Sequence, residues 1–277
     1  MTTFIEPMLA HPMTADFSPA ESGWVAEEKY DGHRLCVVVS GKSVKAWSRN
    51  AIARALPPHL VEALGALPDG TFDGELIALG KQKSYGVTEL TNADKLCFVV
   101  FDILEVMGRN TMSHSYGDRR LLLEETFRTM RHNDSLLLSW MTPVRKMADV
   151  HRLAQEVWAR GGEGLIVKRL EDTYTPSKRS RGWLKVKQCG HATLKIIGYV
   201  PGKLGPYATV LLEDKDGNTT KVKTLNDKER AALAKNPVLF IGEQLCIEFQ
   251  ERTPDGSYRH PRWDHWASQS GFDNGGE

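Results

Sequence analysis

The sequence predicts an α+β protein of two domains, and three observations lead to this fold class. The chain has 277 residues, which is more than one typical small domain contains. Its hydrophobic content of 41% and charged content of 26% are those of an ordinary globular protein. Apolar runs and amphipathic helices follow one another without the regular alternation of a doubly wound parallel sheet. We therefore expect a domain with antiparallel sheets over residues 1–188 and a smaller domain over 189–277.

Strands are predicted wherever β-branched, aromatic and aliphatic residues gather in short runs bounded by turn residues. One of these runs reads as a hairpin that turns at Ser40-Gly41-Lys42. In the larger domain the runs are 23–32, 33–50, 70–79, 96–106, 164–170 and 182–188.

Helices are predicted where apolar residues recur at helical spacing. One should begin near Pro57-Pro58. A second covers 118–132, with Asp118 in the N-cap position. A third begins at Met147 and is closed by Gly161-Gly162, because glycine readily ends a helix.

The composition of the sequence changes in the C-terminal part. Short alternating strands are expected in 193–202, 207–225 and 243–263, with turns at Asp216-Gly217 and Asp255-Gly256. One short helix, "DKERAALAK", interrupts them. About five strands and one helix in this length suit a small Greek-key barrel of the OB type.

Charge and cysteine content exclude several classes of protein. The net charge is only +1, so binding of nucleic acid would have to rest on local basic patches. The four cysteines are far apart and form no CxxC pair, which argues against a zinc site or a disulfide framework. We find no signal peptide and no membrane span, and we expect a monomer in the reducing cytoplasm.

The stretch "EEKYDGHRL" raises the main functional question, which is the role of Lys29. A lysine at a strand end is most often a solvated charge. It can instead be a nucleophile, if burial or neighbouring charges help the amine to lose its proton. Asp31-Gly32 would form a tight turn close to a ligand, and Arg34 would clamp a phosphate with its fork of donors.

Later stretches of the chain favour the second interpretation of Lys29. Acids stand in or beside apolar strands, where they are costly unless they bind something. Lysines alternate with apolar residues in "GWLKVKQ", as on one face of a strand. The residues concerned are Glu75, Phe101, Asp102, Glu163, Lys168, Lys185 and Lys187.

The stretches "EKYDG", "WSRN", "FDGEL", "FDILE", "EGLIVK" and "WLKVK" occur in this order. Together they resemble the motifs of covalent nucleotidyltransferases, and within these the ATP-dependent DNA ligases of the minimal two-domain type. "EPMLA" near the N-terminus is similar to the lead-in of bacterial and phage members. The resemblance covers the chain from about Glu6 to Arg262. It implies an adenylation domain followed by an OB-fold domain.

The resemblance implies that the protein seals nicks in double-stranded DNA during repair, replication or recombination. ATP would leave AMP on Lys29, and AMP would then pass to the DNA. The implied cofactor is Mg²⁺, for which Mn²⁺ can substitute. Positively charged side chains and a metal suit phosphoryl transfer, which depends on positioning and neutralisation of charge.

The resemblance also implies a role for each matching residue. Glu27 would contact the adenine edge and Phe101 would stack on the ring. Asp31 and Arg34 would hold the ribose and phosphate, and Glu75 would accept the ribose hydroxyl. Arg49 would bind the 5′-phosphate of the nick. Glu163 would bind a divalent metal, and Lys185 and Lys187 would hold the α-phosphate.

Residues 176–188, "PSKRSRGWLKVKQ", carry five basic residues and no acid. This run is either a solvated loop or a surface that binds DNA phosphates. We favour the phosphate contact for Lys178, Arg179 and Arg181, because the run leads directly into Lys185 and Lys187.

One departure from the family and three alternatives remain open. The Arg-x-Asp-Lys motif that usually ends the OB domain is not recognisable, and Arg259 or Arg262 could substitute for it. The alternatives are a messenger-RNA capping guanylyltransferase, an RNA ligase and a non-catalytic OB protein that binds nucleic acid. Labelling with ATP or GTP, sealing of nicked DNA or RNA, and a gain of AMP on Lys29 would separate them.

Overall fold

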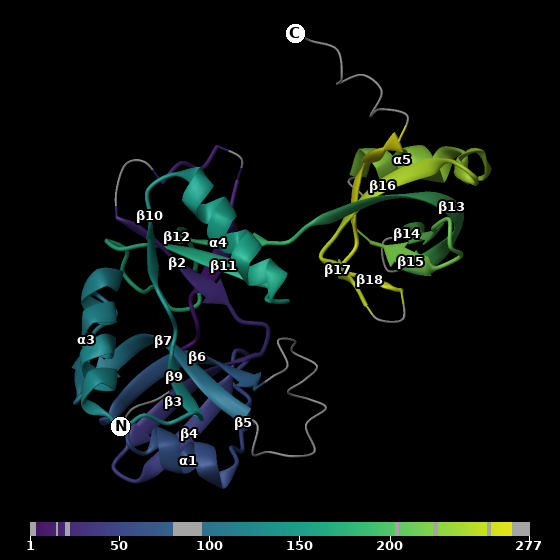
Figure 1. The fold of residues 1–277 in the computed structure, drawn as a ribbon. Helices are drawn as coiled ribbons and strands as arrows, with labels where there is room; N and C mark the ends of the chain where they lie inside the picture. The colour runs from purple at the N-terminus through teal and green to yellow at the C-terminus, as the bar shows by residue number, and fades with distance from the viewer. Residues whose placement is uncertain are drawn as a thin grey trace. The chain divides into compact units, whose positions relative to one another are not determined.

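The computed structural model describes residues 4–14, 16–19, 23–79, 96–202, 205–223, 227–253 and 256–267. The chain divides into two compact units, Met1–Lys187 and Gln188–Glu277 (Figure 1). The first unit contains two sheets and the second contains a curled antiparallel sheet, so the predicted α+β class is confirmed.

One sheet of the first unit carries the N-terminal strand and the two lysine-bearing strands. Its order is β1-β12-β11-β2-β10. All its pairings are antiparallel except that of β1 with β12, which is parallel. The strands are β1 (Leu9–Pro12), β2 (Trp24–Lys29), β10 (Thr142–Val144), β11 (Gly164–Arg169) and β12 (Arg179–Lys187).

The other sheet is built around the predicted hairpin and the two apolar runs. Its order is β5-β4-β3-β6-β7-β8, and β9 adds to β7 in parallel. Gly41 turns the hairpin with a positive φ of 57°. The strands are β3 (His33–Ser40), β4 (Ser43–Ser48), β5 (Ala53–Arg54), β6 (Gly70–Ala78), β7 (Leu96–Val106), β8 (Arg109–Asn110) and β9 (Leu136–Leu138).

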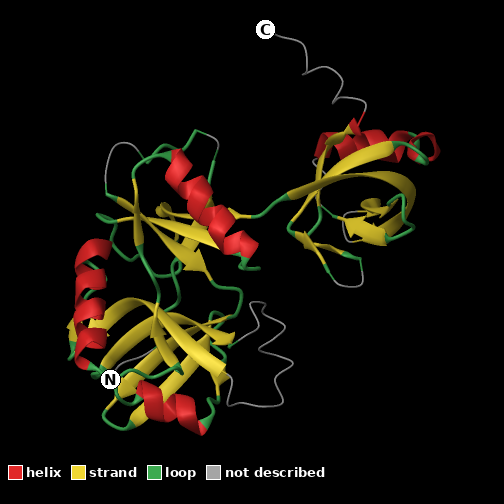
Figure 2. Cartoon of the chain, viewed as in Figure 1, coloured by secondary structure: helices red, strands yellow, loops and turns green. Residues whose placement is uncertain are grey.

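Within the described part of this unit, three helices cover the sheets, namely α1 (Pro58–Leu64), α3 (Tyr116–Thr129) and α4 (Met147–Ala159). Leu60 and Leu64 of α1 join Leu123 of α3 in the core of the β3-containing sheet. The apolar face of α4 packs on β11 and β2 (Figure 2). Each sheet therefore has its own apolar core.

The predicted N-cap of α3 is wrong. The helix begins at Tyr116, and Ser115 is its N-cap. The Ser115 Oγ accepts a hydrogen bond from the Asp118 amide at 3.1 Å, while it donates to the Asp118 carboxylate at 2.6 Å. In the "SYGD" stretch the serine hydroxyl thus caps the helix, and the acid that follows three residues later accepts a hydrogen bond from that hydroxyl.

The second unit contains the sheet β15-β14-β13-β16-β19, in which all pairings are antiparallel. Its core is apolar and includes Leu233 from the helix. This curled sheet is consistent with the predicted OB fold. Gly217 makes the predicted first turn with φ 81°, whereas Asp255 of the second lies outside the described residues. The elements are β13 (Gly190–Gly202), β14 (Gly205–Glu213), β15 (Thr219–Val222), α5 (Asp227–Lys235), a 3₁₀ helix at Pro237–Phe240, β16 (Gln244–Phe249), β17 (Glu251–Arg252), β18 (Tyr258–Arg259) and β19 (Arg262–Trp266).

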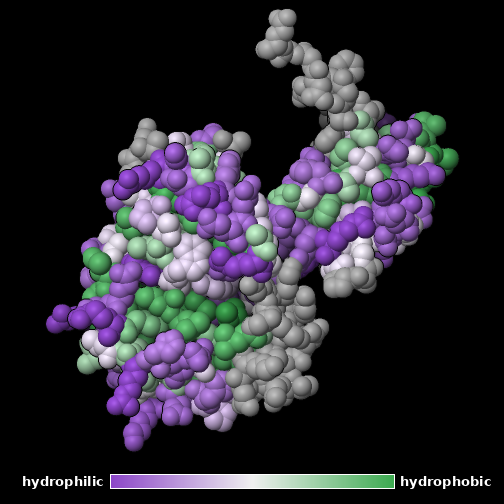
Figure 3. Space-filling model, in the orientation of Figure 1, coloured by the Kyte–Doolittle hydropathy of each residue, from purple (hydrophilic) through white to green (hydrophobic). Residues whose placement is uncertain are grey.

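Hydrophilic side chains cover much of the face of the first unit seen in Figure 3, and an apolar area remains over β7 and β9. Within the described ranges, no helix has both the length and the apolar character needed to cross a membrane.

Candidate active site

A cavity of about 410 Å³ lies in the first unit and is lined by residues of both sheets. Seven of its lining side chains are basic and three are acidic, so the cavity suits an anionic ligand. Nine of the residues to which the sequence assigns a binding or catalytic role border it, and Lys168 lines it as well. The nine are Glu27, Lys29, Arg34, Arg49, Glu75, Phe101, Arg179, Lys185 and Lys187.

The register of the first sheet brings Lys29 and Lys187 to the same point. Both residues pair with Gly164, the first residue of β11, from the strands on either side. Gly164 has a φ of +146°, and a Cβ there would lie 2.0 Å from the Val186 carbonyl oxygen. Only glycine fits, and this close approach places Glu163 between the two lysines.

Glu163 forms an ion pair with each of these lysines. Its Oε2 accepts from the Lys29 Nζ, and its Oε1 lies 2.5 Å from the Lys187 Nζ. The glutamate side chain is only 5% exposed, whereas that of Lys29 is 22% exposed. Lys29 is therefore not a freely solvated surface charge, but an amine that borders the cavity and is held by a buried carboxylate.

Arg34 is fixed by a bidentate ion pair. Its Nε and Nη2 donate to the two carboxylate oxygens of Asp73, at 2.9 and 2.6 Å. Tyr174 donates a further bond to Asp73 at 2.7 Å. Burial opposes the charge of Arg34, but the ion pair with Asp73 outweighs it and raises the pKa of the guanidinium. Arg34 also lies over the ring of Phe101, at 5.3 Å from its centroid.

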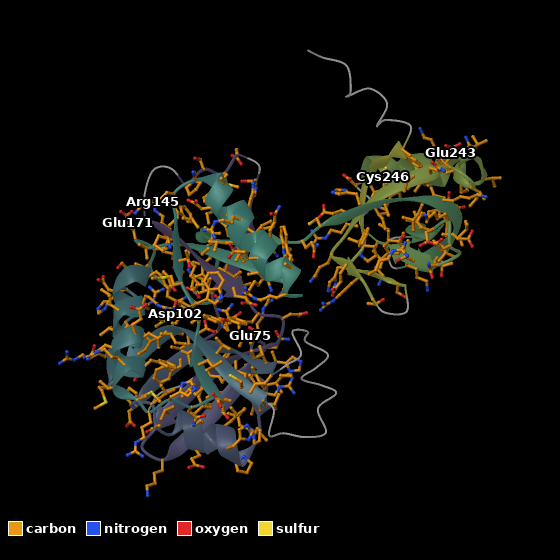
Figure 4. All side chains as sticks on the ribbon, viewed as in Figure 1. Glu75, Asp102, Arg145, Glu171, Glu243 and Cys246 are labelled. Carbon is orange, nitrogen blue, oxygen red and sulfur yellow. The ribbon has the colours of Figure 1, made fainter. Side chains whose placement is uncertain are left out.

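Glu75 is a half-buried acid that borders the cavity from β6 (Figure 4). Burial raises its pKa to about 8, although Lys29 and Arg34 act in the opposite direction. Its carboxyl group therefore keeps a proton near neutral pH, unlike an exposed glutamate.

Glu27 forms the most deeply buried acidic part of the cavity wall, with 2% of its surface exposed. Its Oε1 lies 2.9 Å from the Lys168 Nζ and accepts from the Tyr116 hydroxyl. Its Oε2 accepts from the Ser139 Oγ at 3.0 Å. The predicted base-contacting residue is thus tied into a buried network.

Aromatic rings surround Lys168 beside Glu27. The Lys168 Nζ lies 4.3 to 4.9 Å from the ring centroids of Trp183, Tyr116 and Phe101. Burial lowers the pKa of Lys168, with Glu27 acting against this shift. Phe101 and Trp183 border the cavity, which gives it the flat apolar surface that stacking on a base requires.

Asp102, next to Phe101, has a structural rather than a ligand-binding contact. It forms a bidentate ion pair with Arg119 of α3, at 2.7 and 2.9 Å, and both side chains are fully buried. Figure 4 labels Asp102 on β7. Its pair with Arg119 ties α3 to β7 and so fixes the strand that carries Phe101.

The predicted DNA-binding residues do not share one location. Arg49 and Arg179 border the cavity, and the Arg179 guanidinium donates to the Ala10 carbonyl oxygen. Lys178 and Arg181 are exposed and lie outside the cavity lining. Most of the basic run belongs to β12 rather than to a loop.

The remaining predicted residues lie near the cavity or in the other unit. Asp31 is half-buried and does not line the cavity, whereas Gly32 does. In the second unit Arg259 pairs with Glu251 at 2.7 Å, and Arg262 is exposed.

Several residues of the site were not assigned a role from the sequence. Asp73 orients Arg34, Trp183 adds an aromatic wall, and Ser139 and Tyr116 hold Glu27. An acid in an apolar strand was a signal for Asp73. Ser139 carried no signal, because it lies 112 residues from its partner in the chain.

The fit of a divalent cation can be judged from the carboxylates. Among the described residues, no cluster of three or more His, Cys, Asp or Glu could hold a metal ion. Glu163 does not itself line the cavity, but its buried carboxylate pairs with Lys29 and Lys187, which do. Mg²⁺ is commonly held by one or two carboxylates together with substrate phosphates and water, and a single carboxylate fits that pattern once its lysine partners are displaced.

Comparison with known proteins identifies relatives over most of the chain. A DNA ligase of Thermococcus onnurineus is 29% identical over 283 aligned positions, which cover 90% of this chain and 50% of that protein. The chain thus spans about half the length, or less, of the first curated relatives it matches.

Two solved structures share the fold. A structure from a study of Lig E DNA ligases matches with a TM-score of 0.74 and 23% identity, and covers 95% of this chain and 100% of that one. A mycobacterial DNA ligase D, solved with ATP and MES, matches with a TM-score of 0.57 and 24% identity, and covers 95% and 94%. The family model for the ATP dependent DNA ligase domain matches residues 7–187, which is more than half of the chain and includes the whole cavity lining. The chain therefore belongs to the ATP-dependent DNA ligase domain family.

Proposed function

We propose that the protein is an ATP-dependent DNA ligase that seals nicks in duplex DNA. The observation that carries this proposal is the position of Lys29, which borders a cavity rich in basic side chains and is held by a buried carboxylate. The curated DNA ligase relative and the family match support the same activity.

In the first step, the Lys29 amine would attack the α-phosphorus of ATP. A phosphorus–nitrogen bond forms, the bond from the α-phosphorus to the bridging oxygen breaks, and pyrophosphate leaves. The amine must first lose a proton, and Glu163 Oε2, which already accepts a hydrogen from it, is the nearest described acceptor. Lys187 and Lys185 border the same space and would neutralise the α-phosphate.

The adenosine would lie on the aromatic and acidic side of the cavity. Phe101 would stack on the base, and Glu27 would accept a hydrogen bond from its edge. Arg34, held rigid by Asp73, would contact the ribose or phosphate. Glu75 would contact a ribose hydroxyl.

Glu163 would also hold a divalent cation together with the phosphate oxygens of ATP. A bound Mg²⁺ would neutralise charge on the phosphates. Because Glu163 is paired with two lysines, those pairs would have to loosen when ATP and the cation enter.

DNA would be bound through its phosphates. Arg49, which borders the cavity, would bind the 5′-phosphate of the nick, to which AMP is transferred. Attack by the 3′-hydroxyl on this adenylated phosphate would then form the phosphodiester bond and release AMP. Lys178 and Arg181 would contact the DNA backbone outside the cavity, without reading sequence.

The test is sealing of a nicked duplex with ATP and Mg²⁺ by the wild-type protein and by Lys29→Ala. We expect the variant to lose AMP labelling and sealing, and to retain sealing of a nick that already carries AMP, since that step does not use the amine as nucleophile. Lys42→Ala, at an exposed position of the β3–β4 turn, is a matched control. Normal AMP labelling of Lys29→Ala would refute the proposal, and labelling only by GTP would favour a guanylyltransferase.

A further inference from the structure

The carboxylate of Glu27 has three hydrogen-bond donors in the folded protein. They are the Lys168 Nζ at 2.9 Å, the Ser139 Oγ at 3.0 Å and the Tyr116 hydroxyl. A carboxylate offers about four lone-pair sites. Three are thus filled from inside the protein, and Glu27 borders the cavity, where a ligand can use the fourth.

The direction of these hydrogen bonds is fixed by a residue farther back. The Arg120 Nη1 lies 3.0 Å from the Ser139 Oγ, and a guanidinium can only donate. The serine oxygen therefore accepts from Arg120, and its single hydrogen is left for Glu27. Arg120, Ser139 and Tyr116 do not line the cavity, so they reach a ligand only through Glu27.

The same logic applies on the other side of the carboxylate. The Lys168 Nζ lies 3.4 Å from the Tyr116 hydroxyl, and an ammonium also can only donate. The tyrosine oxygen therefore accepts from the lysine and gives its hydrogen to Glu27. Burial and the nearby Glu27 charge raise the pKa of Tyr116 well above its usual value, so this hydroxyl keeps its proton.

We propose that Arg120 and Ser139 are positioning residues that hold Glu27 as a pure acceptor, and thereby make the base subsite select a purine with an exocyclic amine over one with an exocyclic carbonyl. Adenine carries the amine at that position and guanine carries the carbonyl. This inference rests on the proposed use of a nucleoside triphosphate by Lys29.

The chemistry of the rejected base explains the size of the effect. A carbonyl oxygen facing Glu27 would bring two acceptors together in a buried place, where unpaired polar groups are costly. Sites built to pair a particular donor can discriminate by large factors against analogues that lack it. The discrimination depends on Glu27 keeping its orientation, which is what the Arg120–Ser139 chain supplies.

The experiment measures labelling of Lys29 by ATP and by GTP, as the ratio of the two kcat/KM values. The variants are Ser139→Ala and Ser139→Thr, which keeps the hydroxyl. Thr111→Val is the matched control: Thr111 is equally buried, at 1% exposure, and among the described residues its hydroxyl bonds only the Ile103 carbonyl oxygen, at 2.6 Å.

We expect Ser139→Ala to lower the ATP-to-GTP ratio about tenfold, the factor that corresponds to roughly one hydrogen bond. The change should appear in the KM for ATP, with kcat nearly unchanged, because the residue acts on base binding. Ser139→Thr and Thr111→Val should keep the wild-type ratio. A folded Ser139→Ala protein with the wild-type ratio would overturn the inference.

Arg120→Met gives a second test, which also serves if Ser139→Ala does not fold. Arg120 and Ser139 act in series, so each single variant and the double variant should lower the ratio by a similar factor. Fully additive losses would refute the chain, because they would mean that the two residues act separately. Wild-type protein that labels with neither nucleotide would refute the proposed function itself, an outcome distinct from unaltered selectivity in the variants.

Discussion

Glu75 should make the folded protein less stable as the pH rises, which is the opposite of what most carboxylates do. Burial raises its pKa from 4.5 to about 8. Between these two values the folded protein keeps a proton that the unfolded chain has already released. The free energy of unfolding should therefore fall as the pH rises through this window, and Glu75 should add no further change above it. An ordinary ion-paired carboxylate, with a lowered pKa, has the opposite effect.

The magnitude follows from the size of the window. A difference of about 3.5 pH units corresponds to an upper bound of roughly 5 kcal/mol. Glu75 is only half-buried, so solvent screening reduces this value, and we expect a loss of about 2 kcal/mol. Glu75→Gln mimics the protonated form at every pH, so it should escape the loss.

Urea unfolding at pH values of about 5 and about 9 tests this prediction. The two proteins should be about equally stable at the lower pH, and the variant should be more stable by about 2 kcal/mol at the higher pH. Glu62→Gln is a suitable control, since Glu62 is an exposed glutamate on α1. An identical decline in wild type and Glu75→Gln would show that Glu75 is not protonated in the folded state.

Three further predictions concern metal binding, DNA binding and stability. Glu163→Ala should lose most sealing activity while circular dichroism shows a folded protein, and wild-type sealing with unchanged Mg²⁺ dependence would contradict the metal role. The double replacement Lys178→Ala with Arg181→Ala should make the slope of log affinity for nicked DNA against log salt shallower by up to about two. AMP labelling should be nearly unaffected. An unchanged slope would show that these two residues are solvated and do not contact DNA phosphates. Arg179→Ala should in addition impair AMP labelling, because this residue borders the cavity. Asp102→Ala should lower the free energy of unfolding by about 3–5 kcal/mol in urea titrations, because it leaves a buried guanidinium unpaired, and a loss below about 1 kcal/mol would contradict this reasoning.

Local patterns in the sequence predict the elements of this protein well. The Ser40-Gly41-Lys42 turn, the buried strands β6 and β7, and the end of α4 near Gly161 follow from residue types that favour those structures. The predicted N-cap of α3 lies three residues too late, because both Ser115 and Asp118 are good N-cap residues. The hydrogen bond from the Asp118 amide decides between them, and that bond is a property of three-dimensional structure.

The residues of the candidate site also fall into two groups, those that sequence patterns identify and those that they do not. Residues inside a motif, such as Lys29 and Glu163, are recognisable because short stretches of chain carry them together with their neighbours. Ser139 and Arg120 are not, since Ser139 reaches Glu27 through the pairing of β9 with β7, and Arg120 reaches Ser139 through the packing of α3. Sequence patterns indicate which residues are candidates for the chemistry, but long-range contacts determine which residues hold those candidates in place.

The pairing of charges in the cavity bears on how a triphosphate would enter it. Lys29 and Lys187 share one carboxylate, so the three groups together carry a surplus positive charge. An entering phosphate would compete with Glu163 for both ammonium groups, while Arg34 stays bound to Asp73 through two hydrogen bonds. On the proposed function, binding would be an exchange of ion pairs, whose net free energy is smaller than the attraction of two free lysines for a phosphate. The exchange would release the Glu163 carboxylate as an oxygen ligand for a divalent cation, and so would couple binding of the nucleotide to binding of the metal.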